Sequence, residues 1–388
     1  MNEQYYRPGS RNAQEPRSAQ AVRSRQIRSW IILVSIVVLT LLGVHFFRSV
    51  GAKQEITASK LPCYASQSVT PFGDNVLYYD GTNMHCLTSS GTIRWSFPLG
   101  AGFEFSVGPT HFVAWSDRQM FIVDRDGHPS YNEAMDGKVQ FARIGDRFCA
   151  AVIGDNEMQS SLVVKELNGT QKDVEADAFK NMMVLDTGFY GDQGQYLWTL
   201  SMDVYGTAPN TVLNTFQIGK MNTGEVSLGE FLTYKVLFED NRLRVFTTQQ
   251  MYTYDYKCVQ DTNATMLVYG WKVIDDEIPE RGSATILMAP TTQTSSAQTI
   301  TELRALRGDT DLRYTLPSTC VGAALHDGNI FAFSREYMYR ANVNGQKFYA
   351  YSLPLTEETG VTGFHGITSD GKAILSTGET VYSVALPQ

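Results

Sequence analysis

Hydrophobic positions follow two different patterns along this chain. Near its start, Trp30 to Phe47 form an uninterrupted apolar run of 18 residues (WIILVSIVVLTLLGVHFF). A helix of that length measures about 27 Å, close to the thickness of about 30 Å of the hydrocarbon core of a bilayer. The run therefore predicts one transmembrane helix at residues 30–47, with a tail at 1–29 and a linker at 48–60.

The second pattern is a strict alternation of apolar and polar positions in short runs that polar turns separate. Four stretches align as strand, tight turn, strand and second turn, at residues 76–91, 113–127, 244–258 and 331–345. Alternation of Val, Phe, Tyr and Ile with a period of two is typical of β-strands, and the turns have hairpin length. A further strand follows each unit, as at 92–99 and 346–355. The repeat therefore consists of four antiparallel strands.

A four-stranded unit repeated every 36 to 55 residues or so is typical of a β-propeller. The sequence accordingly predicts an all-β, eight-bladed propeller of four-stranded antiparallel blades over residues 61–388. The units lie near 68–100, 101–136, 137–177, 178–233, 234–275, 276–319, 320–355 and 356–388. The sixth unit, which contains TTQTSSAQT at 291–299, is the least regular, and seven blades are the alternative.

The last unit lacks one strand of the repeat. Residues 374–388 match two strands, and the sequence ends where the outermost strand is expected. A three-stranded last blade would leave an unpaired edge and an open ring. The segment LPCYASQ (61–67) precedes the first blade and has the length of one strand. We therefore predict that residues 61–67 complete the last blade and close the ring.

Closure by an N-terminal strand also predicts where the linker reaches the propeller. The outermost strand of a blade begins on the face that carries the third hairpin turn. The linker at 48–60 is then expected on the face that bears the turns at Gly73, Gly91, Gly127 and Gly345. We predict that this face lies nearer the membrane, and that the face near Asp117 points away from it.

Charge orients the predicted span. Residues 1–29 contain six arginines and two glutamates, a net charge of +4. The net charge of the whole chain is −8, so the remaining residues carry −12. Basic flanks stay in the cytoplasm, which predicts a single-pass type II protein of the cell membrane with an extracytoplasmic propeller. Arg23, Arg25 and Arg28 are expected to lie against anionic headgroups, at ~1 kcal/mol each. The tail is otherwise expected to be disordered, with a docking peptide for a cytoplasmic protein as the alternative.

Two alternatives to an anchor fit less well. A cleaved signal peptide usually has an apolar run of 7–15 residues or so, and the only weak cleavage candidate here is Val50-Gly51-Ala52. A lipoprotein attachment at Cys63 lacks the small residues expected before it. The acidic remainder of the chain also argues against nucleic acid as a partner, because little positive charge is left to neutralise phosphates.

The repeat carries a family resemblance. HCLTSSGTIRWSF (85–97) resembles the strand–turn–strand core of PQQ-like propeller repeats, and weaker copies span roughly residues 68–388. The arrangement of a basic tail, one span and a propeller is similar to membrane-anchored propeller proteins of Gram-positive bacteria. Some members of the wider superfamily are quinone-dependent dehydrogenases, and others, the BamB-like scaffolds, hold partners without catalysis, so the resemblance implies a fold and not one chemistry.

Residue types that carry chemistry do not occur in the spacings that enzymes or metal sites require. The five cysteines include no C-x-x-C, the six histidines form no H-E-x-x-H, and no G-x-S-x-G or P-loop occurs. Asp124 to Gly127 lacks the spacing of a calcium loop and is predicted to be a turn. The four tryptophans of the repeats fall in separate units, unlike the docking motif of quinone dehydrogenases. We therefore expect no catalysis, no cofactor and no metal.

The cysteines have two possible roles. Cys149 lies in a strand pattern (RFCAAVI) and is predicted to be a small core residue. Cys63 and Cys86 flank the first unit, and a disulfide between them is the alternative to free thiols. An odd number of cysteines leaves at least one unpaired.

The fourth unit departs from the repeat in a way that suggests a contact site. Its second hairpin, within residues 196–220, is longer than its counterparts and is expected to project from the face away from the membrane, opposite the closing blade. Tyr205, Thr207, Pro209 and Asn210 cluster at its tip, and aromatic residues on protruding loops are frequent binding anchors. A neutral insertion is the alternative.

Together these patterns predict a non-catalytic, membrane-anchored scaffold that binds a protein partner at the cell envelope. A receptor for a small ligand or glycan in the propeller funnel is the alternative, and a quinone-dependent enzyme is a third. A stiff ring with short loops suits a scaffold because it offers a pre-formed surface at little ordering cost.

Overall fold

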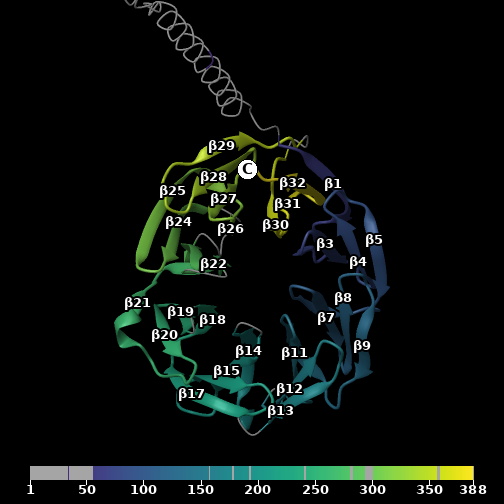
Figure 1. Ribbon diagram of the computed structural model, residues 1–388, viewed down its shortest axis with the longest axis vertical. Coiled ribbons are helices and arrows are strands. Elements are labelled where there is room, and N and C mark those ends of the chain that lie inside the picture. Colours follow the sequence, from purple (N-terminus) through teal and green to yellow (C-terminus); the bar gives the residue numbers. More distant parts are fainter. Residues whose placement is uncertain are drawn as a thin grey trace, which may run out of the picture. The chain divides into compact units, whose positions relative to one another are not determined.

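In the computed structural model, residues 56–387 form a closed ring of eight four-stranded antiparallel sheets around a central axis (Figure 1). The prediction of eight blades is confirmed and the alternative of seven is wrong. The structure describes Val34 and residues 56–387 except 157, 177–178, 192–193, 240–241, 280–282, 293–299 and 356–358; of residues 221–222 it describes the backbone alone.

The first four blades follow one another along the chain, each running from an inner to an outer strand. Blade 1 contains β2 (Thr70–Phe72), β3 (Asn75–Tyr79), β4 (Asn83–Thr88) and β5 (Ile93–Pro98). Blade 2 contains β6 (Glu104–Val107), β7 (His111–Ser116), β8 (Gln119–Asp124) and β9 (Pro129–Ala134). Blade 3 contains β10 (Val139–Ile144), β11 (Phe148–Ile153), β12 (Ser161–Glu166) and β13 (Gln171–Glu175). Blade 4 contains β14 (Met183–Tyr190), β15 (Tyr196–Asp203), β16 (Asn210–Gln217) and β17 (Met221–Gly229).

The remaining blades complete the circle. Blade 5 contains β18 (Thr233–Glu239), β19 (Arg242–Thr247), β20 (Gln250–Asp255) and β21 (Met266–Leu267), with a 3₁₀ turn η2 (Thr262–Ala264) before β21. Blade 6 contains β22 (Trp271–Glu277), β23 (Thr285–Pro290), β24 (Ile300–Arg307) and β25 (Thr310–Cys320). Blade 7 contains β26 (Gly322–His326), β27 (Asn329–Phe333), β28 (Tyr337–Asn342) and β29 (Tyr349–Ser352). Blade 8 contains β30 (Gly363–Ile367), β31 (Lys372–Thr377), β32 (Thr380–Ala385) and, outermost, β1 (Ala58–Tyr64).

One predicted boundary between units is wrong. Trp271–Glu277 is the inner strand of blade 6, whereas the sequence pattern assigned residues up to 275 to the fifth unit. The cause is the outer strand of blade 5, which has only two residues and follows a loop with a 3₁₀ turn. Alternation cannot reveal a two-residue strand, so the pattern extends the fifth unit into the next full strand.

The closing strand is confirmed. Strand β1 pairs antiparallel with β32, with Ala58 opposite Val384 and Lys60 opposite Tyr382, and the register shifts at a bulge before Tyr64. It begins at Ala58, three residues earlier than predicted, and ends at Tyr64. At Gly91 in blade 1, a Cβ would lie 2.9 Å from the Lys60 carbonyl oxygen, and its φ of +91° also favours glycine. This glycine lets blade 1 approach the closing strand.

The ring has two distinct faces. We call the face with the first and third turns of each blade the entry face, because Ala385 N donates to Thr57 O there, at 2.9 Å, where β1 begins. We call the other face the connection face, because it carries the second turns and the links between blades; Val139 N, for example, donates to Asp117 O at 2.7 Å. The predicted side of entry is thus confirmed, and its nearness to a membrane stays a prediction.

Apolar side chains fill each gap between neighbouring blades. The described residues form eight buried clusters, and each draws mainly on two adjacent blades. The cluster between blades 8 and 1 contains Leu61 and Cys63 of the closing strand with Ile374 and Val381 of blade 8 and Val76 of blade 1. The stability of the ring is therefore shared among eight similar interfaces, each of which buries apolar surface.

The predicted transmembrane segment, Trp30–Phe47, lies outside the described residues apart from Val34. Within the part of the chain that the structure describes, no helix has the length and apolar character needed to cross a membrane.

Closure predicts the effect of truncating a closing-strand side chain. Leu61 is 1% exposed in the cluster between blades 8 and 1. Leu61→Ala should lower the free energy of unfolding by about 3 kcal/mol, measured by urea denaturation, because it removes buried methyl groups and leaves a cavity. Tyr64→Ala on the same strand is the control: Tyr64 is 62% exposed, so this change should shift stability by less than ~0.5 kcal/mol. Equal effects of the two substitutions would show that β1 is not packed as described.

Candidate functional site

The predicted contact residues lie on the connection face of blade 4. Tyr205 is 69% exposed in the turn between β15 and β16, and Thr207 and Pro209 are exposed beside it. Asn210 is half-buried, and its side-chain oxygen accepts a hydrogen bond of 2.6 Å from Ser227 Oγ. Tyr205 N donates to Asp203 Oδ1 at 2.9 Å, which fixes the turn. The turn therefore presents an exposed tyrosine on a constrained backbone.

The prediction that this hairpin exceeds its counterparts holds only in part. The turn between β15 and β16 covers residues 204–209, but the corresponding segments of blades 3 and 6 cover 154–160 and 291–299 and are longer. What distinguishes blade 4 is the length of its paired strands, eight residues each in β15 and β16. Blade 4 does lie across the ring from the closing blade (Figure 1).

Sequence reasoning missed four further exposed apolar residues on the same face. Phe231 and Leu232, 40% and 55% exposed, lie in the link between blades 4 and 5. Leu267 and Tyr269, 66% and 73% exposed, lie at the link between blades 5 and 6. The available signal was a pair of neighbouring apolar residues at each link, Phe231-Leu232 and Val268-Tyr269. We call these four residues, with Val204 and Tyr205, the apolar strip.

Backbone contacts connect the parts of the apolar strip. Thr211, just after the turn that holds Tyr205, pairs with Gly229, just before the link that holds Leu232. Thr248 N, in the second turn of blade 5, donates to Leu232 O at 3.2 Å. Val268 N, at the next link, donates to Gln249 O in that same turn at 2.9 Å. The strip thus runs from blade 4 across blade 5 to the edge of blade 6. Clustered exposed apolar side chains of this kind mark interaction surfaces more often than scattered ones do.

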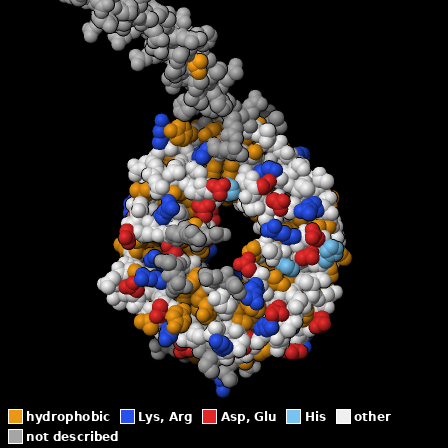
Figure 2. Space-filling view, in the orientation of Figure 1, with side chains coloured by type: hydrophobic (Ala, Val, Ile, Leu, Met, Phe, Trp, Pro, Cys, Tyr) orange, Lys and Arg blue, Asp and Glu red, His pale blue; other side chains and the backbone are white. Residues whose placement is uncertain are grey.

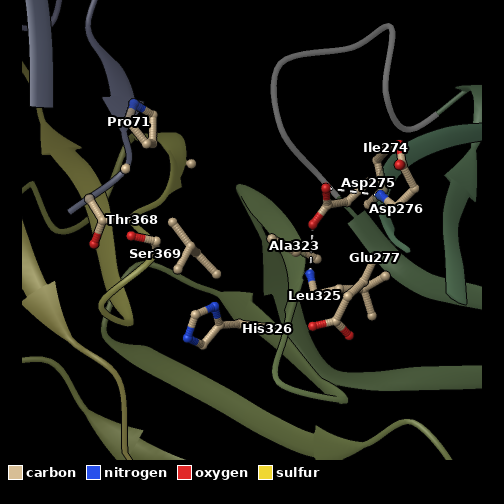
Figure 3. A pocket seen from close by; sticks show the side chains of 14 residues that line it. Pro71, Ile274, Asp275, Asp276, Glu277, Ala323, Leu325, His326, Thr368 and Ser369 are labelled. Carbon is tan, nitrogen blue, oxygen red and sulfur yellow. Dashed lines mark hydrogen bonds between the residues drawn. The ribbon is translucent and has the colours of Figure 1, made fainter. Parts of the chain in front are cut away.

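A second candidate lies in the central channel, which charged side chains of both signs border (Figure 2). A cavity of about 450 Å³ is lined by the inner strands of blades 6, 7, 8 and 1 near the entry face. Figure 3 shows Asp275 and Glu277 on one side, Thr368 and Ser369 on the other, and His326 between them. The lining combines carboxylate and hydroxyl groups with apolar residues such as Pro71 and Ile274, so the cavity suits a ligand with both polar and apolar parts.

The carboxylates of this cavity also hold blades 6 and 7 together. Leu325 N donates to Asp275 Oδ2 at 2.7 Å, and Gly328 N donates to Glu277 Oε2 at 3.1 Å. Asp276 forms an ion pair of 3.0 Å with Lys235 of blade 5. Burial raises the pKa of Asp275 to about 6, although backbone hydrogen bonds from Leu325 and Asp276 oppose the rise. Within the described residues, no three His, Cys, Asp or Glu side chains are grouped to hold a metal ion.

The cysteines lie in the core as free thiols. All five are buried and unpaired, so the alternative disulfide between Cys63 and Cys86 is wrong. Cys149 is 1% exposed in the cluster between blades 2 and 3, which confirms it as a core residue. Burial raises the pKa of Cys63 to about 11, which disfavours the reactive thiolate. The other predicted contact residues, Arg23, Arg25 and Arg28, lie outside the described residues.

Comparisons with known proteins identify the fold. No family model matches the sequence, and no curated protein matches it. The structure is similar to BamB from Moraxella catarrhalis, with a TM-score of 0.52 and 10% identity over 85% of this chain and 98% of BamB. It is similar to the WD40 domain of SCAP from fission yeast, with a TM-score of 0.52 and 8% identity over 85% of this chain and 98% of that one.

A third similar structure is the tricorn protease, with a TM-score of 0.51 and 10% identity. This match covers 84% of this chain but only 36% of the protease. The chain therefore has a BamB-like and WD40-like propeller fold. At such low identities the three similarities show the architecture alone.

The buried Asp275 carboxyl predicts a pH-dependent stability. Its folded-state pKa of about 6 lies above the ordinary value of 3.8, so the folded protein binds the extra proton between these pH values. Its ionisation therefore lowers stability as the pH rises through this window. Asp275→Asn carries no charge, so its free energy of unfolding relative to wild type should increase by about 2 kcal/mol between pH 4 and pH 7.5.

The measurement is urea denaturation of both proteins at each pH. The single side-chain oxygen of Asn cannot replace both carboxylate oxygens as acceptors of the backbone hydrogen bonds. The resulting loss in the free energy of unfolding is similar at every pH, so it does not change the pH dependence. A difference between variant and wild type that stays constant across the range would contradict the perturbed carboxyl.

Proposed function

We propose that this protein is a non-catalytic scaffold, anchored in the cell membrane by residues 30–47, whose propeller binds an envelope protein outside the cell. The observation that carries the proposal is the apolar strip, which exposes six large apolar side chains on neighbouring segments of one face. Clustered apolar side chains on the surface are unfavourable in water, and binding of a partner would remove them from water.

The position of the strip suits a tethered scaffold. The closing strand β1 begins on the entry face, so a chain that precedes it reaches the ring from that side. The apolar strip lies on the connection face. We place that face away from the membrane, where a partner could approach without competing with lipid headgroups.

The composition of the strip also fits a protein partner. Tyr205 and Tyr269 each offer an apolar ring with a hydroxyl group, and tyrosines are enriched among the residues that dominate interface energies. Short turns hold both side chains on a stiff ring, so little ordering would oppose binding. The acidic net charge of the chain outside the tail favours a partner with a basic surface around its apolar contact.

A second candidate function is a receptor for a small ligand in the channel. The cavity of about 450 Å³ has the size for a sugar-sized molecule, and its carboxylates would favour a cationic one. Those carboxylates are already engaged in hydrogen bonds between blades, so we rank this function second.

The scaffold proposal predicts that the double substitution Tyr205→Ser and Tyr269→Ser removes partner binding. Crosslinking in intact cells, followed by affinity purification of the full chain, should recover the partner at least about tenfold less efficiently. The reason is that loss of the two tyrosine rings should weaken the binding free energy by at least ~1.4 kcal/mol, which corresponds to a tenfold lower affinity. The matched control is Ile93→Ser with Tyr349→Ser, two residues that are 52% and 56% exposed on the entry face. This control should retain the partner.

Retention of every partner by the strip variant would reject the scaffold proposal. Thermal stabilisation of the purified propeller by cationic sugars or cell-wall fragments would then favour the receptor. Equal melting temperatures of the wild type and both double variants ensure that the comparison reports binding and not unfolding.

A further inference from the structure

A hydrogen-bonded chain of three side chains in blade 1 links a carboxylate to a serine hydroxyl. His85 Nε2 lies 2.8 Å from Asp80 Oδ2, and His85 Nδ1 lies 2.7 Å from Ser96 Oγ. Asp80 is in the second turn, His85 in β4 and Ser96 in β5. We propose that Ser96 is a nucleophilic serine, activated by His85 and assisted by Asp80, that is acylated by activated carboxylic esters.

The direction of each proton in this chain follows from the carboxylate. Hydrogen bonds from His85, Asn83 and Thr82 hold the pKa of Asp80 well below its usual range, so Asp80 is ionised and can only accept. His85 Nε2 must therefore carry the proton that it shares with Asp80. In the neutral imidazole, Nδ1 then has a free lone pair and accepts the hydrogen bond from the Ser96 hydroxyl. This is the protonation state that a general base requires.

The surrounding residues hold the arrangement in place. Asp80 Oδ1 accepts hydrogen bonds from Thr82 N at 2.8 Å and Asn83 N at 2.7 Å, which leaves Oδ2 directed at His85. The His85 ring stacks on Tyr78, with centroids 4.7 Å apart and planes 20° apart. The carboxylate and the imidazole are thus both fixed before any reagent arrives, which lowers the entropic cost of reaction.

Strand register brings the histidine and the serine together. His85 and Ser96 are direct partners in the β4–β5 ladder. Leu99 N donates to Thr82 O, so alternation along the ladder makes His85 and Ser96 a non-hydrogen-bonded pair, in which side chains lie closest. The Ser96 N–H then points toward the outer side of β5, where no strand of the described chain pairs. That N–H is available to stabilise an oxyanion formed at the serine.

Ser96 is exposed, whereas the side chains of His85 and Asp80 are 15% and 27% exposed. The nucleophile is therefore accessible, and its base is partly shielded from water. In the proposed step, Ser96 Oγ bonds to the ester carbonyl carbon and its proton passes to His85 Nδ1. When the bond from that carbon to the leaving oxygen breaks, the proton passes to the leaving alkoxide. The products are an acyl ester on Ser96 and a free alcohol.

This inference does not depend on the proposed scaffold function. It concerns blade 1, whereas the apolar strip lies on blades 4 to 6. Acylation of one serine modifies the protein and requires no turnover. The three residues meet through strand pairing and a turn, and not through a local sequence motif such as G-x-S-x-G.

The test is reaction of the full-length protein with p-nitrophenyl acetate, followed by peptide mass spectrometry after short times. Acetylation of Ser96 should be at least tenfold faster than that of Ser130 and Ser227. These are matched internal controls, because both are exposed serines in outer strands, and their hydroxyls bond to oxygen atoms and not to an imidazole. Continued release of p-nitrophenolate that Ser96→Ala abolishes would support the nucleophilic serine equally, since it shows that the acyl group hydrolyses, and it would contradict the non-catalytic part of the proposed function.

Two variants test the role of each partner. His85→Gln should lower the rate at Ser96 at least tenfold and leave the rates at Ser130 and Ser227 unchanged, which also shows that the fold is retained. Asp80 is a positioning residue: the Asp80→Asn amide can donate to Nε2 and favour the tautomer that lacks the free lone pair at Nδ1. Its labelling rate at Ser96 should therefore fall while those at Ser130 and Ser227 stay unchanged, and NMR of the His85 ring should show the proton moved from Nε2 to Nδ1.

The proposal is overturned if Ser96 reacts no faster than Ser130 and Ser227. It is also overturned if His85→Gln reacts at the wild-type rate. In either case the three residues would serve only to stabilise the second turn of blade 1.

Discussion

The ring depends on one pairing between distant parts of the chain, the antiparallel ladder of β1 with β32. Without β1, blade 8 would expose an unpaired edge, and the cluster between blades 8 and 1 would lose Leu61 and Cys63. A propeller has no single central core that could compensate, because its apolar side chains are divided among the interfaces between blades. The closing ladder therefore determines whether eight separate sheets behave as one stiff body.

Stiffness links the fold to the candidate sites. Neighbouring blades are joined by apolar packing and also by polar ties, such as the ion pair of 3.0 Å between Arg143 and Asp186 of blades 3 and 4. Because the blades are fixed, residues on separate links share one surface, as Leu232 and Tyr269 do in the apolar strip. The same rigidity holds Asp275 in a partly buried position on the channel wall. Each site thus follows from closure and not from a local motif.

The architecture could be predicted because its signals are local in sequence. Alternation identified the four-stranded repeat and its eight units, and the unpaired edge argument identified β1 although its partner lies more than 300 residues away. The boundary between blades 5 and 6 was missed because Met266–Leu267 is too short to show alternation. The sites were largely missed for a different reason. Tyr205 was found as part of a departure from the repeat, whereas Tyr269, Asp275 and the pairing of His85 with Ser96 depend on which residues the ring and its registers bring together.

The most direct measurement of closure is a disulfide across the closing ladder. Lys60 and Tyr382 are direct partners, and the hydrogen bond from Ala385 N to Thr57 O makes them a non-hydrogen-bonded pair with Cα atoms about 4.5 Å apart, within disulfide range. Under mild oxidation, Lys60→Cys with Tyr382→Cys should form this bond, detected as a shift on a non-reducing gel. Ser59→Cys with Tyr382→Cys should not, because neighbouring residues of a strand point to opposite sides. Equal crosslinking of both pairs, or none in either, would contradict a ring closed by β1 in this register.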